Sequence, residues 1–340
     1  MSRNMQHSVS LVIPVFNGAE YLGQCLDAIL TSDSRPLEII VVDDGSTDAS
    51  YQIAIERGAA VLQLPSRSGP AAARNYGATK AKGEILFFID ADVAIKRDAI
   101  GRVIEHLATH PEHAAVFGSY DDAPPAQNFI SQYKNLFHHF VHQHSNMEAF
   151  TFWAGCGAVR MEAFKAAAGF DHNRYPRPSI EDIELGYRMK EMGYRIALDK
   201  QLQAKHLKRW TIRTFLRSDI LDRAIPWSVL ILEHKHMPKD LNLRLTDKLS
   251  AAFACLSVSM FPFFPRKPWT LVVSLLLMLL ILLMNKRLYT FYLYRKGASF
   301  ALSAFFVHVF YYLYCTMALV LGLIRSGLIS AREAKVAYRA

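Results

Sequence analysis

The sequence predicts an α/β protein with a mixed, mostly parallel sheet covered by helices on both faces, followed by helices at and in a membrane. Up to about residue 200, short apolar runs rich in β-branched residues alternate with helical stretches. Acidic and turn-forming residues follow several of these runs, and long apolar runs without charge occur only after residue 248. These three observations place a ligand-binding domain before a membrane domain.

Composition agrees with this division. The chain has 340 residues, 39 Lys and Arg against 30 Asp and Glu, and 51% hydrophobic residues. This length suggests about two domains, and the apolar content excludes a disordered chain. The four cysteines lie far apart in the sequence, so neither a disulfide framework nor a cysteine zinc site is expected.

The predicted elements of the first domain are short. Continuous apolar strands that alternate with helices are typical of a parallel sheet with both faces covered. The predicted strands are Val9–Val15, Leu37–Asp43, Ala60–Leu64, Glu84–Ile89 and Ala115–Gly118. The predicted helices are Ala19–Leu30, Asp48–Glu56, Gly69–Ala81 and Asp98–Thr109.

Polar residues gather where three of these strands end. The first strand leads into residues 14–18, the second into residues 43–48, and the fourth into Asp90-Ala91-Asp92. Ligands of parallel sheets bind beyond the carboxyl ends of the strands. Asp90 and Asp92 project to the same side in extended geometry, so a divalent cation or a basic group is expected between them. The alternative for residues 43–48 is a turn in which Asp or Thr caps the next helix.

Two common nucleotide-binding motifs are missing from the sequence. No Walker loop precedes a helix, and no Gly-x-Gly-x-x-Gly follows a strand. This argues against a P-loop ATPase and against a nicotinamide dehydrogenase.

Several segments resemble, in order, the motifs of family 2 glycosyltransferases with the GT-A fold, a Rossmann-like nucleotide-binding architecture. The resemblance runs from about residue 9 to about residue 210. It rests on Val12-Ile13-Pro14-Val15-Phe16-Asn17, Val41-Val42-Asp43-Asp44-Gly45-Ser46-Thr47-Asp48, Ala72-Ala73-Arg74-Asn75-x-Gly77, Phe88-Ile89-Asp90-Ala91-Asp92 and Glu181-Asp182-Ile183-Glu184-Leu185.

The resemblance implies a nucleotide-sugar donor, a divalent cation (Mn²⁺ or Mg²⁺) and inversion at the anomeric carbon. The residues implied to hold the base and ribose are Pro14, Phe16, Asn17, Asp43 and Asp44, and uracil would suit an acid that accepts its ring N–H.

The same resemblance assigns the phosphate and metal contacts. Arg74 is expected at the donor's phosphates or base, and its alternative is an ion pair on a helix surface. Asp92 is the expected direct metal ligand. Asp90 is expected to hold the ribose, a sugar hydroxyl or the waters of the metal.

Glu181 and Asp182 open a predicted helix. Inverting transfer to a hydroxyl needs one carboxylate base opposite the leaving group. Asp182 is the expected base and Glu181 a neighbour that orients the acceptor or the sugar. The alternative is that both acids only complement the helix N-terminus.

Two later segments complete the expected site. His206-Leu207-Lys208-Arg209-Trp210 resembles the Gln-x-x-Arg-Trp motif of processive polysaccharide synthases, with His in place of Gln. It implies His206 as a metal ligand, Arg209 at the diphosphate and Trp210 at the acceptor; alternatively, His206 is simply solvated. Gly155 lies in a small-residue segment that resembles the family's acceptor region, although its glycines could merely make a turn.

The rest of the chain points to a membrane. Lys200–Lys248 holds eleven Lys and Arg against five Asp and Glu, interleaved with apolar residues, which is typical of helices on an anionic membrane surface. The alternative is a soluble helix packed on the sheet. The charge-free runs 249–265, 268–285 and 297–324 follow. The last two are long enough to span a bilayer, whereas the first could be a span, half of a re-entrant hairpin or an interfacial helix.

The expected domains are therefore 1–205 (catalytic), 206–248 (interfacial helices), 249–325 (two to three transmembrane helices) and 326–340 (basic tail). Met1 to Val9 is polar, so no secretory signal is expected and the catalytic domain should face the cytoplasm. The placement of Lys and Arg between the runs leaves the number of spans open.

The function expected from these features is a metal-dependent inverting transferase in the cytoplasmic (inner) membrane. Its acceptor would be a glycolipid, a lipid-linked oligosaccharide or another lipid hydroxyl, and export of a product would need a partner or a homo-oligomer. Nucleic acid is not an expected partner. The alternatives are a polyprenyl-phosphate sugar synthase, whose acceptor needs no base, and a non-catalytic nucleotide-sensing scaffold in the membrane.

Overall fold

A computed structural model describes residues 8–234 and 244–337, with the side chains of residues 325–337 excepted. The chain divides into two compact units, one ending at Trp210 and the other beginning at Thr211. Most of the N-terminal stretch expected to lack a signal, part of the expected interfacial segment (235–243) and the last three residues of the expected tail lie outside the described residues.

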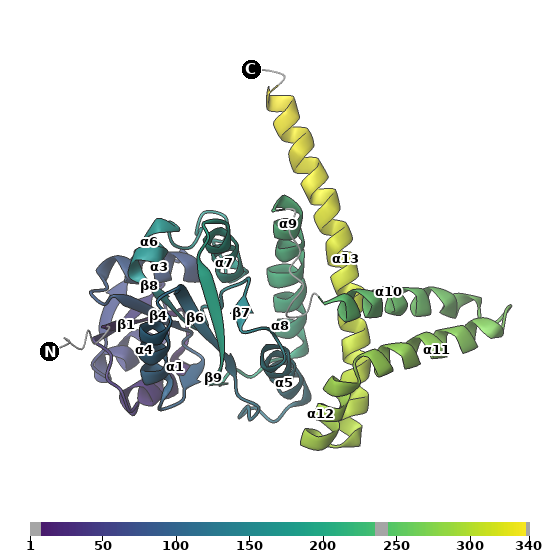
Figure 1. The fold of residues 1–340 in the computed structure, drawn as a ribbon, viewed down its shortest axis with the longest axis horizontal. Helices are drawn as coiled ribbons and strands as arrows, with labels where there is room; N and C mark the ends of the chain where they lie inside the picture. Colours follow the sequence, from purple (N-terminus) through teal and green to yellow (C-terminus); the bar gives the residue numbers. More distant parts are fainter. Residues whose placement is uncertain (1–7, 235–243, 338–340) are drawn as a thin grey trace. The chain divides into compact units, whose positions relative to one another are not determined.

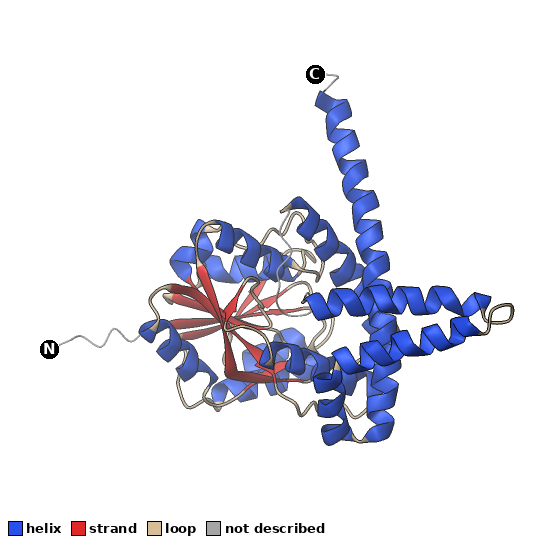
Figure 2. Cartoon of the chain, turned by 45° about the vertical axis from the view of Figure 1, so that its right-hand side comes forward, coloured by secondary structure: helices blue, strands red, loops and turns tan. Residues whose placement is uncertain are grey.

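The N-terminal unit contains a nine-stranded mixed sheet with helices on both faces (Figures 1 and 2). Its strand order is β3-β2-β1-β4-β8-β6-β9-β5, and β7 also pairs with β9. The strands from β3 to β4 are parallel, whereas β8 runs antiparallel to both β4 and β6. The strands are β1 (Val9–Val15), β2 (Glu38–Asp43), β3 (Ala60–Gln63), β4 (Ile85–Ile89), β5 (Val93–Ile95), β6 (His113–Tyr120), β7 (Glu148–Ala149), β8 (Cys156–Arg160) and β9 (Arg195–His206).

Successive side chains of the central strands enter different cores because strand residues alternate between the two faces of a sheet. Leu11 and Phe87 pack with helices α1, α2 and α4, whereas Val12 and Phe88 pack with α3, α6 and α7. The continuous apolar runs in the sequence follow from this burial on both sides. The helices of this unit are α1 (Ala19–Leu30), α2 (Ser50–Glu56), α3 (Pro70–Lys80), α4 (Ala99–Thr109), α5 (Phe129–Gln143), α6 (Met161–Ala166) and α7 (Glu181–Glu191).

The predicted fold class is confirmed, and the predicted strands and helices up to residue 118 all exist. The bounds of β1 and α1 agree with the prediction, and every other predicted end lies within two residues of the observed one. Four strands were not predicted: β5, β7, β8 and β9.

The C-terminal unit is helical. Its elements are α8 (Ile212–Leu216), the π-helical stretch η1 (Arg217–Ala224), α9 (Ile225–Glu233), α10 (Leu245–Met260), the short 3₁₀ helix η2 (Phe261–Phe263), α11 (Trp269–Met284), α12 (Lys286–Lys296) and α13 (Ala298–Ala337). Within α13, residues 298–324 form one helix that is long and apolar enough to cross a membrane. Helices α11 and α12 satisfy the same length and hydropathy criteria only when taken together, and the chain bends by 75° between them.

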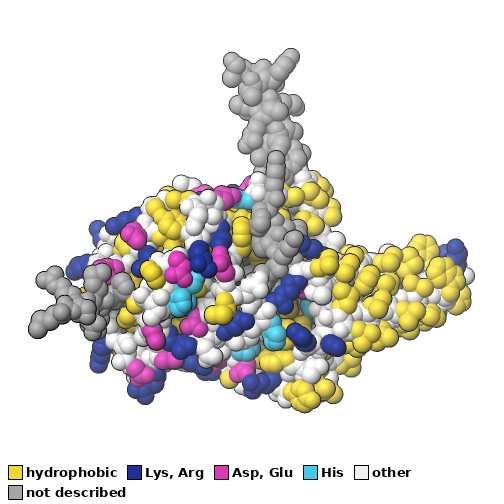
Figure 3. Space-filling view, viewed as in Figure 1, with side chains coloured by type: hydrophobic (Ala, Val, Ile, Leu, Met, Phe, Trp, Pro, Cys, Tyr) yellow, Lys and Arg dark blue, Asp and Glu magenta, His cyan; other side chains and the backbone are white. Residues whose placement is uncertain are grey.

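Helices α10 and α11 form a hairpin whose surface is largely apolar (Figure 3). Exposed side chains on its arms include Leu256, Leu275, Leu276, Leu279 and Leu283. Each arm has 16 residues, or about 24 Å of helix at 1.5 Å per residue. The inner faces are joined by the hydroxyls of Ser257 and Ser274, 2.7 Å apart and buried. The two hydroxyls therefore satisfy each other's hydrogen bonding inside an otherwise apolar hairpin.

Candidate active site

The carboxyl ends of β1 and β2 are tied together by backbone and side-chain hydrogen bonds. Asn17 has a positive φ of 49°, and its N–H donates to Oγ of Ser46 at 2.9 Å. Oδ1 of Asn17 accepts from the N–H of Thr47 at 2.8 Å. Asn17 therefore shapes the loop that the sequence placed beside the nucleotide, next to Pro14 at the end of β1.

Asp43 and Asp44 are both buried and organise the loops around them. Oδ1 of Asp43 accepts from the N–H of Ser46 at 2.9 Å. The turn that was the alternative prediction for residues 43–48 is therefore present and is stabilised by Asp43. Asp44 accepts from the N–H groups of Ser68 at 2.6 Å and Gly69 at 2.8 Å, just before α3 begins. The Asp44 carboxylate thus connects the end of β2 to the start of the helix that carries Arg74.

Phe16 lies at the surface of this region, with 36% of its area exposed. The guanidinium carbon of Arg67 lies 3.9 Å from the centre of the Phe16 ring. Together they form an exposed pair of flat groups beside the β1 and β2 loops. The sequence did not point to Arg67, because no motif contains it.

Arg74 is the centre of the site and is buried. Its Nη2 donates to Oδ1 of Asp90 at 2.6 Å, and its Nη1 donates to Oε1 of Glu181 at 2.8 Å. Burial alone would lower the pKa of Arg74, but the carboxylates of Asp90 and Glu181 raise it above its usual value. The predicted alternative, an ion pair on a helix surface, is wrong because α3 turns this side chain into the protein.

Two neighbours on α3 explain how Arg74 is held. A Cβ on Gly77 would lie 2.5 Å from Cγ1 of Val12, so glycine lets α3 approach the sheet closely. Asn75 donates to the carbonyl of Phe170 at 2.7 Å and accepts from its N–H at 2.9 Å. These contacts explain why asparagine and glycine follow the arginine in the Arg-Asn-x-Gly segment.

Asp92 and His206 come together from the turn after β4 and from the last residue of β9. Nε2 of His206 lies 3.8 Å from Oδ2 of Asp92, and Nζ of Lys208 lies 3.7 Å from the same oxygen. Burial would raise the pKa of Asp92, but the His206 ring and the Lys208 charge hold it below its usual range. The carboxylate is therefore ionised at neutral pH.

This pair is suited to a divalent cation. Two adjacent ligands of a first-row cation lie about 3 Å apart, so a small movement brings Asp92 and His206 onto one ion. The His206 ring is buried and stacks on Tyr120, with ring centres 4.4 Å apart. Asp90 was expected at the ribose, a sugar hydroxyl or the waters of the metal. Its Oδ1 accepts from Arg74, so the basic group that was the alternative to a cation is present beside this carboxylate.

Glu181 and Asp182 begin α7, as the sequence predicted. Oε2 of Glu181 accepts from the N–H of Ser179 at 2.9 Å, while Oε1 holds Arg74. Oδ2 of Asp182 accepts from the N–H of Ala154 at 3.0 Å. Glu181 therefore faces the donor-side arginine, and Asp182 faces the small-residue segment expected near the acceptor.

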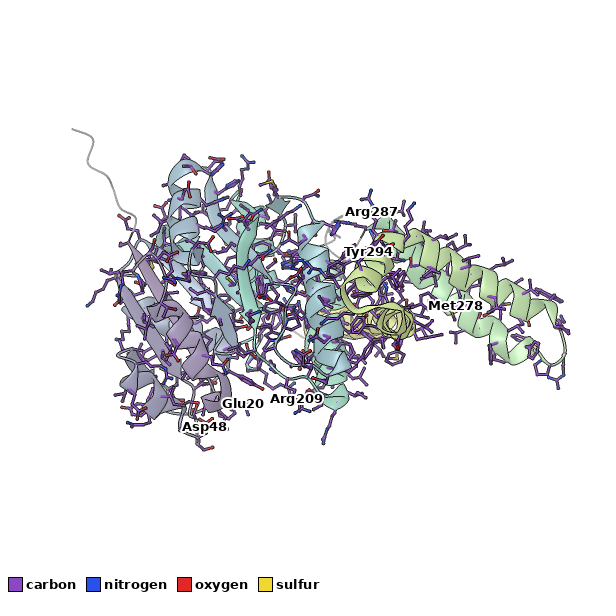
Figure 4. All side chains as sticks on the ribbon, turned by 90° about the horizontal axis from the view of Figure 1, so that it is seen from below. Glu20, Asp48, Arg209, Met278, Arg287 and Tyr294 are labelled. Atoms are coloured by element: carbon purple, nitrogen blue, oxygen red, sulfur yellow. The ribbon has the colours of Figure 1, made fainter. Side chains whose placement is uncertain are left out.

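Arg209 and Trp210 follow β9. The N–H of Arg209 donates to the hydroxyl of Tyr21 at 3.3 Å. Figure 4 labels Arg209, Glu20 and Asp48, which come from the segment after β9, from α1 and from the loop between β2 and α2, and which lie along one edge of this unit. Trp210 is only 8% exposed.

Two lysine ammonium groups contact the Trp210 ring. Nζ of Lys134 is 3.9 Å and Nζ of Lys208 is 4.6 Å from the ring centre. The expected role of this ring at the acceptor stays a prediction.

An aromatic cluster beside His206 was not predicted. Tyr120 contacts Trp153 edge-on, with ring centres 4.8 Å apart, and His138 at 4.5 Å. Gly155 supports this cluster, because a Cβ there would lie 2.7 Å from the Trp153 ring. Tyr120 is the last residue of β6. Its position near the carboxyl end of a predicted strand was the one sequence feature that could have identified it as a site residue.

Comparison with known proteins agrees with this geometry. The model of the family "Glycosyl transferase family 2" matches residues 10–167. Glycosyltransferase GlyG of Streptococcus pneumoniae is 33% identical over 121 residues, which are 34% of this chain and 40% of GlyG. Pre-mycofactocin glycosyltransferase of Mycobacterium tuberculosis is 28% identical over 221 residues, which are 61% of this chain and 44% of that protein. The chain thus spans less than half the length of either relative.

A solved structure shares the fold. Mannosyltransferase PcManGT from Pyrobaculum calidifontis, in complex with GDP-Man and Mn²⁺, has a TM-score of 0.57 at 18% sequence identity. The alignment covers 93% of this chain and 88% of PcManGT. The predicted GT-A fold is confirmed by this likeness. The family model and the relatives show that residues 10–167 form a glycosyltransferase domain of family 2.

Proposed function

We propose that this chain is a metal-dependent inverting glycosyltransferase. It would move a sugar from a nucleotide-sugar, with a UDP-sugar favoured, to a hydroxyl of an acceptor at a membrane surface. The observation that carries the proposal is the bridge from Asp90 through Arg74 to Glu181, which joins the expected donor side to the expected catalytic helix. Such a bridge fixes the base Asp182 relative to the donor loops.

The donor preference rests on hydrogen-bond chemistry. Asp43 and Asp44 have carboxylates at the end of β2, and a carboxylate accepts the ring N–H of uracil. Because PcManGT is solved with GDP-Man, GDP-sugars are the second class of donor to test.

The proposed cation site consists of Asp92 and His206, and the Mn²⁺ in the PcManGT structure supports a divalent cation. A cation bound there supplies positive charge that offsets the charge developing on the departing diphosphate. Arg209 would add charge-assisted hydrogen bonds to the same phosphates.

Asp182 is the proposed base. Its Oδ2 is held by the N–H of Ala154, which orients the carboxylate. It would take the proton of the acceptor hydroxyl as that oxygen attacks the anomeric carbon, and one displacement of this kind inverts the configuration. Glu181 would act through Arg74 and position the reacting groups.

The acceptor and location follow from the C-terminal unit. An apolar stretch in α13 supports membrane association, and the excess of Lys and Arg between Lys200 and Lys248 suits an anionic lipid surface. We therefore propose a multi-pass protein of the cytoplasmic membrane with its catalytic unit in the cytoplasm. The acceptor would be a glycolipid or a lipid-linked oligosaccharide, and export would require a partner or a homo-oligomer.

The first experiment measures nucleotide release from UDP-, GDP- and dTDP-sugars by the full chain in lipid nanodiscs with added lipid extract. We expect release from one donor class that requires Mn²⁺ or Mg²⁺ and falls at least about a hundredfold with EDTA or with Asp92→Ala. Asp98→Ala, which changes an exposed acid outside the site, is the matched control. Metal-independent release would contradict the cation proposal, whereas silence with every donor would favour the nucleotide-sensing scaffold.

Asp182→Asn separates the two enzyme classes. A hydroxyl acceptor should lose about a thousandfold or more in activity, because no group then removes its proton. A polyprenyl phosphate is already ionised and needs no base. The Asp182→Asn variant should therefore transfer sugar to it almost as fast as the wild type does. Donor binding, measured by calorimetry, should remain within a few-fold in both cases.

A further inference from the structure

Three histidines that the proposed reaction does not use lie at the other edge of the sheet. His106 is in the last turn of α4, His110 follows that helix, and His113 begins β6. Strands β4 and β6 both run antiparallel to β8 and therefore point the same way. The start of β6 thus lies at the edge opposite to Asp90 and Asp92, which follow the end of β4.

The ring nitrogens of these residues converge. One nitrogen from each ring lies within 4.8 Å of the others. Nε2 of His106 and Nδ1 of His113 are 3.1 Å apart. Two imidazole nitrogens at this distance share either one proton or one metal ion, because both lone pairs cannot face each other without something between them.

The tautomer of His110 is fixed by the backbone. Its Nδ1 lies 3.1 Å from the carbonyl oxygen of His106 and 3.0 Å from Oγ1 of Thr109. The Thr109 hydroxyl donates its hydrogen to the carbonyl of Glu105 at 2.8 Å. Both neighbours of Nδ1 therefore accept, so Nδ1 carries the proton and Nε2 keeps a lone pair. Metal-binding histidines are oriented by this kind of contact.

Arg160 holds the two segments that carry the histidines. Its Nη2 donates to the carbonyl of Leu107 at 2.6 Å, and its Nε donates to the carbonyl of His113 at 3.0 Å. The end of α4 and the start of β6 are therefore fixed to the same side chain.

We propose that His106, His110 and His113 bind one Zn²⁺ ion, with water as the fourth ligand. Three imidazoles suit Zn²⁺ and its neighbours Ni²⁺ and Cu²⁺, whereas Mg²⁺ and Mn²⁺ prefer oxygen. Tetrahedral zinc needs its nitrogens about 3.4 Å apart. Because His110 is exposed, a small rotation of its ring brings the set to that spacing. The ion would join α4 to β6 and would be separate from the cation at Asp92.

The surroundings of His106 and His113 favour the neutral form of these two rings. Burial lowers the pKa of His106 and of His113 below the ordinary value. Around them lie Glu112 and Asp199, which act against this lowering, and Arg195, which adds to it at His113.

The test uses the full chain in nanodiscs, without an affinity tag, in the Asp92→Ala background so that the other site does not contribute. Zinc binding is measured by competition with a chromophoric chelator, and the ligand geometry by the visible spectrum of bound Co²⁺. The variant is His110→Gln with His113→Gln. The control is His144→Gln, since His144 also follows a helix and has Nδ1 2.8 Å from a carbonyl four residues earlier.

We expect the Asp92→Ala protein and the His144→Gln control to bind one Zn²⁺ at least a hundredfold more tightly than the double variant, with a tetrahedral Co²⁺ spectrum that the variant lacks. In the Asp92-containing chain, the double variant should keep its sugar-transfer rate with Mn²⁺. Equal zinc binding by control and double variant would overturn the proposal and leave a shared proton between His106 and His113. This result would not affect the proposed transfer reaction.

Discussion

At the scale of single residues, Arg74 has the largest structural effect in the site. It joins Asp90 to Glu181, which lies 107 positions after it in the chain. The side chains of Arg74 and Glu181 are each only 6% exposed. Removing the Arg74 guanidinium therefore leaves the buried Glu181 carboxylate without its charged partner, which is much more costly than losing a surface ion pair.

We expect Arg74→Ala to lower the free energy of unfolding by about 3–5 kcal/mol and to abolish transfer. Arg57→Ala is the matched control, because Arg57 pairs with Asp27 at the surface and its loss should cost less than about 1 kcal/mol. Thermal unfolding of both variants in detergent micelles, followed by tryptophan fluorescence, makes the comparison. Equal melting temperatures would mean that the Arg74 bridge is not formed.

The sequence predicted that Arg74, Asp90 and Glu181 belong to one site, but it did not predict the contact between them. Motif order indicates which residues meet at a sheet edge, since parallel strands end together. It does not indicate which carboxylate an arginine selects, because that depends on how α3 and α7 pack. Tyr120 was not predicted for a similar reason. Its place in the site depends on stacking against the His206 ring, which is distant in the sequence.

At the scale of elements, the close packing of α3 on the sheet positions the site. A Cβ on Gly77 would lie 2.5 Å from Val12 and 3.0 Å from Val42, both buried in the sheet. An added methyl group must push α3 outward, since strand backbone and branched side chains cannot move aside. Such overpacking costs about 1–3 kcal/mol.

Gly77→Ala should therefore destabilise the chain and reduce transfer at least tenfold by moving Arg74. Gly101→Ala is the control, because its Cβ would meet only Oγ of Ser34, the end of a side chain that can rotate. Melting temperatures and rates with saturating donor are the measurements. If Gly77→Ala were as stable and active as Gly101→Ala, the close packing of α3 on the sheet would have no role in catalysis.

Elements were predictable where both faces of a strand are apolar. The run in β1 and the amphipathic pattern of α1 gave the observed bounds. Strand β8 has only five residues, two of them small, and β9 carries charged residues at several positions. Their pairing is set by neighbours distant in the sequence, so local patterns could not identify them.

At the scale of the whole molecule, the charge-free runs predicted two to three transmembrane helices, and the observed helices differ in how well they fit. The run 297–324 coincides with a helix that meets the criteria for a span by itself. The run 268–285 gives α11, whose 16 residues reach about 24 Å, shorter than about 30 Å of hydrocarbon. The number of spans therefore stays a prediction, and α13 is the segment on which a test should be made.

If residues 298–324 cross the bilayer, positions on the two sides of this stretch must face different compartments. We expect that, in intact cells expressing the full chain, a membrane-impermeant maleimide labels only one of Lys296→Cys and Ser330→Cys, and that lysis exposes the other.

Met192→Cys, at a half-exposed position on the catalytic unit, should be labelled only after lysis if that unit is cytoplasmic. The same behaviour at positions 296 and 330 would mean that α13 lies along the membrane. Labelling of position 192 in intact cells would instead place the catalytic unit outside. Because these two failures differ, one set of variants tests the crossing of α13 separately from the orientation of the enzyme.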